Sequence, residues 1–132
     1  MTKARLRHIA ISVPDKEKAA KFYQETFGFE RVSESRVATR LSDGVMNITI
    51  LQFQTDEDAG DERGKDFVGL HHFGVWVDDI ETTRQEIEAH GGKYHQGPTG
   101  HSPANAEHKF RDPCGIVFDI STHGWDGAKR TI

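Results

Sequence analysis

The sequence predicts an α+β fold built from two βαβββ modules, because one pattern of strand, helix and turn residues occurs twice in the chain. Residues 6–15 superpose on residues 70–79 when the 132-residue chain is shifted by 64 positions, and the shift brings His8 onto His72. In both copies an alternating apolar strand leads to an aspartate that can cap a helix, and a glycine follows the helix. A repeat of about half the chain indicates one supersecondary unit used twice.

The first module is expected to cover residues 1–53. Residues 6–13 alternate in polarity and predict a strand that carries His8 on one face. Asp15 is the expected N-cap of the next helix, and Gly28 is expected to end it in the left-handed conformation. Three short strands are predicted after this helix, at residues 29–32, 36–41 and 45–53.

Residues 54–69 are expected to form an acidic linker between the modules, because they combine many carboxylates with two glycines and little apolar content. The second module is expected at residues 70–120, with Asp79 as the N-cap of its helix and Gly92 at the end of that helix. The remaining predicted segments are strands at residues 93–95, 106–111 and 116–120, a loop of turn-forming residues at 97–103, and a C-terminal tail at 121–132.

Composition limits the protein to a single domain and excludes several classes of partner. The formal charge of -4 and the pI near 6.0 argue against general binding to nucleic acids or anionic membranes. No apolar run approaches the roughly 18 residues that span a bilayer, and no apolar signal segment precedes the first strand. The lone Cys114 fits a reducing compartment. We therefore expect a cytoplasmic protein with a small-molecule substrate.

The residues that could carry chemistry are two equivalent histidines and one buried acid. Asp119 lies in an otherwise apolar predicted strand, where an ionised carboxylate is costly unless it is paired, hydrogen-bonded or bound to a metal. If the two modules pair about a pseudo-twofold axis, His8 and His72 approach each other. Two imidazoles and one carboxylate suit a divalent metal such as Fe, Mn, Ni or Zn.

Three segments resemble one known family. His-Ile-Ala-Ile-Ser-Val-Pro-Asp at residues 8–15 and the helix that follows resemble the start of vicinal oxygen chelate proteins. Residues 69–80 resemble the start of that family's second module, and residues 110–120 are similar to its last hairpin. The family includes glyoxalase I, methylmalonyl-CoA epimerase, extradiol dioxygenases and the bleomycin and fosfomycin resistance proteins. The resemblance covers essentially residues 6 to 120.

The resemblance implies a single vicinal oxygen chelate domain in which two βαβββ modules form a cupped mixed sheet around a metal or ligand cavity. Carried over to this chain, the ligands of one divalent metal are His8, His72 and Asp119. The family usually has glutamate at the last position. Aspartate is a competent ligand but one methylene shorter, so the metal would sit deeper or be held less tightly.

A fourth family position lies on the last strand of the first module, where glyoxalase I and the epimerase have a glutamate or glutamine that also transfers protons. Here that strand contains Asn47 and Thr49 on one face, and neither is a base. We take both as candidates for the cavity lining. His108 and Arg111 are further candidates, the first as a cavity acid or base and the second as an anchor for an anionic substrate.

The resemblance leaves several functions open. Lyase or isomerase chemistry like that of glyoxalase and the epimerase is favoured by chain length, whereas the three-ligand set also fits an extradiol ring-cleaving dioxygenase. A third possibility is a non-catalytic protein that binds a drug or metabolite, as bleomycin resistance proteins do. Because a lone sheet would leave edges and an apolar face open, we expect a homodimer.

Overall fold

The computed structural model describes residues 3–60, 63–99 and 107–131, and it confirms the α+β fold. Eight strands form one mixed sheet in the order β2-β3-β4-β1-β5-β8-β7-β6. The first five elements are β1 (Arg5–Ser12), α1 (Lys16–Phe27), β2 (Glu30–Glu34), β3 (Ala38–Ser42) and β4 (Asn47–Leu51). They are followed by α2 (Asp56–Ala59), β5 (Gly69–Trp76), α3 (Ile80–Ala89), β6 (Lys93–Thr99), β7 (Glu107–Arg111) and β8 (Val117–Ser121).

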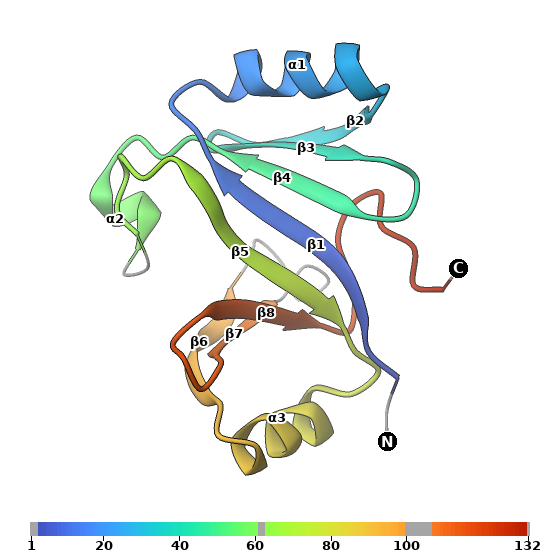
Figure 1. The fold of residues 1–132 in the computed structure, drawn as a ribbon, viewed down its shortest axis with the longest axis vertical. Coiled ribbons are helices and arrows are strands. Elements are labelled where there is room, and N and C mark those ends of the chain that lie inside the picture. Colours follow the sequence, from blue (N-terminus) through green and yellow to red (C-terminus); the bar gives the residue numbers. More distant parts are fainter. Residues whose placement is uncertain (1–2, 61–62, 100–106, 132) are drawn as a thin grey trace.

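Both long helices begin at the predicted caps. The Asp15 carboxylate accepts a hydrogen bond from the Lys18 backbone N–H at 3.1 Å, and Asp79 caps α3 in the same way. Gly28 ends α1 with φ 74°, a conformation that glycine adopts without strain. Each helix lies against the strands of its own module, α1 near β2–β4 and α3 near β6 (Figure 1).

Each module has its own small apolar core under its helix. In the first module the buried cluster contains Ile11, Ala20, Leu41 and Ile50. In the second module it contains Val77, Phe110 and Ile120. Because strand residues alternate between faces, polar side chains lie on the opposite face of the sheet. We call the face under the helices the outer face and the opposite one the inner face.

The two modules join through their first strands. β1 pairs antiparallel with β5, while β1 pairs parallel with β4 and β5 pairs parallel with β8. This arrangement is the same in both halves, as the sequence repeat predicts. It places His8 and His72 on adjacent central strands, with Ala10 opposite His72 and Gly74 opposite His8.

Two segments differ from the expectations. The linker contains a one-turn helix, α2, which is held to the first module by an ion pair of 2.8 Å between Arg36 and Asp58. β6 continues through Gly97 to Thr99, so the loop expected at 97–103 is wrong for its first three residues, and residues 100–103 lie outside the described part. Residue 106 of the predicted seventh strand also lies outside it.

The C-terminal tail leaves the second module and returns to the first. Its backbone accepts hydrogen bonds from the Ser42 hydroxyl at Gly127 and from the Asn47 amide at Asp126. Figure 1 shows this final segment running beside the ends of β3 and β4. The tail therefore ties the second module to the first near the inner face of the sheet.

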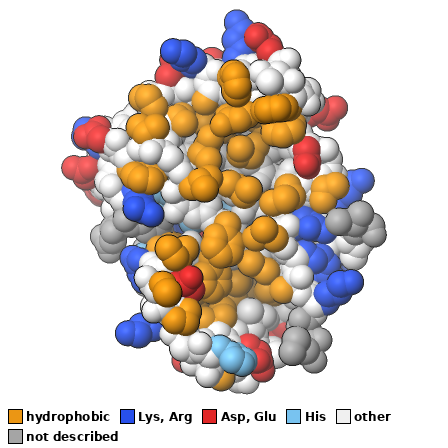
Figure 2. Space-filling view, viewed as in Figure 1, with side chains coloured by type: hydrophobic (Ala, Val, Ile, Leu, Met, Phe, Trp, Pro, Cys, Tyr) orange, Lys and Arg blue, Asp and Glu red, His pale blue; other side chains and the backbone are white. Residues whose placement is uncertain are grey.

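The outer face of the central strands is apolar and partly exposed. Figure 2 shows hydrophobic side chains gathered across this face of the molecule. A shallow groove of about 480 Å³ is lined there by Leu6, Ile9, Leu70, Phe73 and Ile116, among others. No helix among the described residues is long and apolar enough to cross a membrane.

Candidate metal centre

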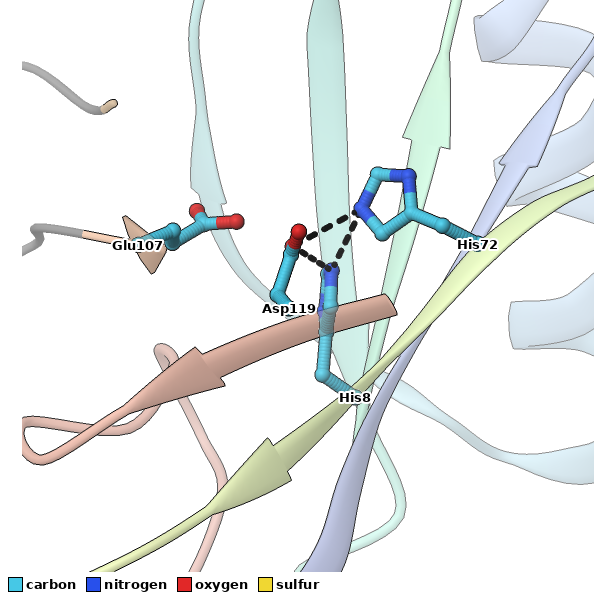
Figure 3. Close-up of side chains that lie close together, drawn as sticks. All are labelled: His8, His72, Glu107 and Asp119. Atoms are coloured by element: carbon cyan, nitrogen blue, oxygen red, sulfur yellow. Dashed lines mark hydrogen bonds and ion pairs between the residues drawn. The ribbon is translucent and has the colours of Figure 1, made fainter. Parts of the chain in front are cut away.

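Four side chains that can bind a metal converge on the inner face of the sheet. His8 comes from β1, His72 from β5, Glu107 from β7 and Asp119 from β8. Their ligand atoms all lie within 4.8 Å of one another. Figure 3 shows the two imidazoles and the Asp119 carboxylate meeting at one point, with the Glu107 carboxylate directed towards them.

The order of the strands explains this convergence. β1, β5, β8 and β7 are consecutive in the sheet, and cross-strand partners point to the same face. Gly74 follows His72 by two residues on β5 and lies opposite both His8 on β1 and Asp119 on β8. A Cβ atom at this position would come within 2.8 Å of His8 and 2.6 Å of Trp125, so only glycine leaves room for both rings.

His8 is held as a neutral imidazole with its Nε2 lone pair facing the centre. Its Nδ1 lies 2.7 Å from the Asn47 side-chain oxygen, and the Asn47 amide nitrogen donates to the Asp126 carbonyl at 2.9 Å. The amide orientation therefore requires that His8 Nδ1 carries the proton. Burial, with a smaller contribution from His72, lowers the pKa of His8 from 6.5 to about 3.

Asn47 is itself held in place by Thr49, whose hydroxyl donates to the Asn47 side-chain oxygen at 2.7 Å. Both candidates from the last strand of the first module are therefore buried beside His8. They orient the imidazole rather than reach the centre themselves. A hydrogen bond to the second ring nitrogen is how proteins usually orient a ligating histidine.

His72 directs its Nε2 at the same point from the other module. This atom lies 3.3 Å from His8 Nε2 and 3.0 Å from Asp119 Oδ2. The His72 Nδ1 atom is 2.8 Å from Nδ1 of His71, the preceding residue on β5. Burial and the neighbouring His72 lower the pKa of His71 to about 4, so His71 is a neutral partner for the His72 ring near pH 7.

Asp119 is fully buried and uses its two oxygens differently. Oδ1 accepts a hydrogen bond from the Lys109 ammonium group at 2.7 Å. Oδ2 accepts no hydrogen bond of good geometry among the described residues, although both histidine Nε2 atoms face it. Burial opposes ionisation, but interactions with Glu107, His72 and Lys109 outweigh it and hold the pKa of Asp119 well below its usual range.

Glu107 is the functional candidate that the sequence analysis missed. Burial and its hydrogen bond with Asp119 raise the pKa of the Glu107 carboxyl group, so the proton shared by these two acids stays on Glu107. The signal that could have identified it is the alternation of side chains along a strand, by which residues two positions apart share a face. Lys109 lies opposite Asp119, so residues 107 and 109 share the inner face.

The other two candidates, His108 and Arg111, lie away from the centre. His108 lies opposite Ile120 and points to the face that carries Phe110 and the apolar core. Arg111 is on the same face of β7 as Glu107 and Lys109 but lies at the far end of the strand, where its guanidinium donates to the Gly115 carbonyl at 2.9 Å. The structure therefore brings neither His108 nor Arg111 to the four-residue cluster.

The donors present fit a divalent metal ion. The nitrogen atoms of two imidazoles and one oxygen of a buried carboxylate face one point, and a second carboxyl group lies beside them. This is a mixed nitrogen and oxygen ligand set of the kind that binds Mn, Fe, Ni or Zn. A cation there would also bind Asp119 Oδ2, which accepts no hydrogen bond of good geometry from the described residues although His72 Nε2 lies 3.0 Å away.

Comparison with known proteins supports the same interpretation of the fold. Residues 5–120 match the model of the Glyoxalase/Bleomycin resistance protein/Dioxygenase superfamily. The chain is similar to hypothetical protein BH1468 from Bacillus halodurans C-125, with a TM-score of 0.73 and 18% identity over 89% of this chain and 93% of that one. No curated protein matches the chain.

Two solved enzymes share the fold at similarly low identity. The Mn(II)-bound glyoxalase from Novosphingobium aromaticivorans matches all of this chain with a TM-score of 0.72 and 19% identity, but this chain spans only 43% of its length. A methylmalonyl-CoA epimerase variant from Streptomyces coelicolor, bound to 2-nitronate-propionyl-CoA, has a TM-score of 0.71 and 20% identity over 88% of this chain and 94% of that one.

Proposed function

Because the chain belongs to the Glyoxalase/Bleomycin resistance protein/Dioxygenase superfamily, we propose that it is a metal-dependent lyase or isomerase for a small substrate with two neighbouring oxygen atoms. His8, His72 and Asp119 would hold one divalent metal ion. The observation that carries this proposal is the buried Asp119 Oδ2, which faces two imidazole nitrogens and accepts no hydrogen bond from the described residues.

The residues around the ligands are arranged to keep them ready for a metal. Asn47 keeps the His8 proton on Nδ1, and the low pKa of His8 keeps that ring neutral over the physiological range. His71 contacts the corresponding nitrogen of His72. A bound divalent metal would act as a Lewis acid that polarises the substrate oxygens and stabilises an enolate-like anion.

Glu107 favours proton-transfer chemistry over ring cleavage. Lyase and isomerase reactions of this kind need a base beside the metal, and the strand that usually provides it in the family has Asn47 and Thr49 here. Glu107 reaches the cluster from β7 instead. Once it has lost the proton that it holds in the metal-free chain, the Glu107 carboxylate would accept the proton from the carbon next to the substrate carbonyl, leave the C–H electrons in the enolate, and return the proton in the second half of the reaction.

The first test is the metal content of the purified full chain, measured by elemental analysis after reconstitution with Mn, Fe, Ni or Zn. We expect about one metal ion per chain, and loss of the metal in His8→Ala, His72→Ala and Asp119→Ala. His108→Ala is the matched control, because this histidine lies on the opposite face, and it should keep the metal. A wild-type chain that binds none of the four ions would overturn the proposal.

The second test distinguishes the reaction types. Metal-loaded protein is incubated in D2O with 2-oxoaldehyde hemithioacetals and with acyl thioesters that carry an acidic α-carbon, and deuterium uptake is followed by NMR. We expect uptake with the wild type and its loss in Glu107→Gln, with the metal content unchanged. Oxygen consumption with catechols, without any deuterium uptake, would instead indicate a dioxygenase. Tight binding of a planar ligand without turnover would indicate a binding protein.

A further inference from the structure

A buried lysine stands next to the candidate metal centre. Lys109 is only 8% exposed, lies opposite Asp119 in the β7–β8 pairing, and places its ammonium nitrogen 2.7 Å from Asp119 Oδ1. Lysine is rarely buried to this extent unless it is paired. The Lys109 ammonium group thus lies beside a carboxylate that would also bind a metal cation.

The contacts of Asp119 indicate that Lys109 and a metal can be present together. Lys109 contacts Oδ1, whereas the two histidine nitrogens face Oδ2. A metal ion bound by Oδ2 leaves the ion pair at Oδ1 intact. Lys109 is thus a partner that orients the ligating carboxylate, and its positive charge remains beside the metal.

The charges at such a centre do not balance without an anion. A divalent metal and the Lys109 ammonium bring three positive charges, whereas Asp119 and Glu107 bring at most two negative ones, and a histidine that binds a metal through its lone pair adds no charge. A surplus of positive charge in a buried site is costly unless a counter-charge is supplied. A bound anion would supply the missing negative charge.

A second cation lies on the same inner face of the first module. Arg40 of β3 is the cross-strand partner of Thr49, so the two side chains share a face. The hydrogen bonds of Arg40 go to the neutral hydroxyl groups of Ser33 and Ser35. The inner face therefore carries positive charge on both sides of the central strands.

We propose that Lys109 makes the metal-loaded centre selective for anionic substrates, in which a carboxylate lies next to a second oxygen atom, as in 2-oxo and 2-hydroxy carboxylates. This inference rests on the proposed metal site and narrows its substrate class. Neutral molecules with two neighbouring oxygens fit the same coordination geometry but do not offset the positive surplus of the metal-loaded centre.

The test compares two small probes of similar shape, pyruvate and hydroxyacetone, which both have neighbouring oxygens but differ in charge. Their binding to the Mn(II)-loaded full chain is measured by calorimetry and by the electron paramagnetic resonance spectrum of the metal. We expect pyruvate to bind the wild type at least about tenfold more tightly. Lys109→Met should remove most of this preference, while Lys93→Met, at an exposed position of β6, should keep it.

A second measurement separates the loss of a charge from simple damage to the fold. Removing the ammonium group leaves Asp119 with its full negative charge for the metal, so Lys109→Met and Lys109→Gln should bind Mn(II) about tenfold more tightly or better, while binding pyruvate more weakly. A misfolded variant would lose both. Equal affinity of the wild type for the two probes, or an unchanged preference in Lys109→Met, would overturn the inference. Failure of the wild type to bind Mn(II) would instead overturn the proposed function.

Discussion

The imidazole of His8 stacks on the indole of Trp125, with ring centroids 4.7 Å apart and planes inclined by only 3°. These residues come from the first strand and from the C-terminal tail, so the two ends of the chain meet at the candidate metal centre. The stack covers one face of a ring that already has Asn47 at its Nδ1. Two interactions of different kinds therefore fix the direction of the His8 lone pair.

Trp125→Ala is expected to loosen this ring. The loss of a large, largely packed aromatic side chain should lower the free energy of unfolding by about 2–3 kcal/mol, towards the low end for Trp→Ala because Trp125 is only partly buried. Metal affinity should fall with it. Urea unfolding and a competition titration with a fluorescent chelator measure the two effects. Trp125→Phe keeps an aromatic face and should stay close to the wild type in metal affinity. If Trp125→Ala binds metal as tightly as the wild type, the stack has no positioning role.

Gly74→Ala is expected to displace the rings of Trp125 and His8. The added methyl group would lie 2.6 Å from Trp125 and 2.8 Å from His8, closer than non-bonded carbon atoms approach. We expect a loss of about 1–3 kcal/mol in stability, as for other overpacked sites, together with weaker metal binding. Chemical unfolding of the double variant Gly74→Ala/Trp125→Ala tests the cause. Because the larger of the two obstructing rings is then absent, the two effects should be clearly less than additive, and strict additivity would contradict this explanation.

Asn47→Leu is expected to weaken metal binding without removing a ligand. Leucine has a similar shape but cannot accept the His8 Nδ1 proton, which leaves the tautomer and the ring orientation unspecified. Changes of this kind usually cost about 10–100-fold in metal affinity. Isothermal titration with Mn(II) measures the change. Thr49→Val removes only the hydrogen bond to Asn47 and should have a clearly smaller effect. An equal loss in both variants would indicate general damage to β4 instead.

The metal-free protein is expected to lose stability as the pH falls below about 6.5. The pKa of His8 is about 3 and that of His71 about 4 in the folded chain, against 6.5 as the ordinary value. Below pH 6.5 the unfolded chain therefore binds protons that the folded chain does not bind. The free energy of unfolding decreases as the pH falls, until the histidines of the folded chain are protonated as well. Between pH 7.5 and pH 5 we expect each histidine to cost on the order of 1–2 kcal/mol.

Urea unfolding at a series of pH values measures this effect. His71→Gln should flatten the dependence between pH 6.5 and pH 4, because one of the two histidines no longer titrates there. His108→Gln is the matched control, since this histidine lies on the other face of the sheet, and it should leave the slope unchanged. A wild-type chain whose stability is constant over this range would contradict the assigned protonation states.

The sequence was sufficient to predict the architecture and to identify the candidate ligands that the two modules contribute symmetrically. Alternation of apolar residues, aspartates at helix starts and glycines at helix ends act within about ten residues, so the elements could be predicted from local pattern. The internal repeat then placed His8 and His72 at equivalent points, and the cost of burying a lone carboxylate singled out Asp119. The family resemblance of residues 6–120 is confirmed by the match over residues 5–120.

Tertiary structure decided which other residues reach the centre. The sequence analysis selected His108 and did not consider Glu107 or Lys109. A shift of one residue in the register of a hairpin exchanges the two faces of a strand, and the observed pairing of Lys109 with Asp119 shows which residues of β7 face the centre. The stack of Trp125 on His8 depends on the path of a tail with no periodic pattern. Contacts between residues far apart in the sequence follow from packing, and no local pattern in this chain encodes them.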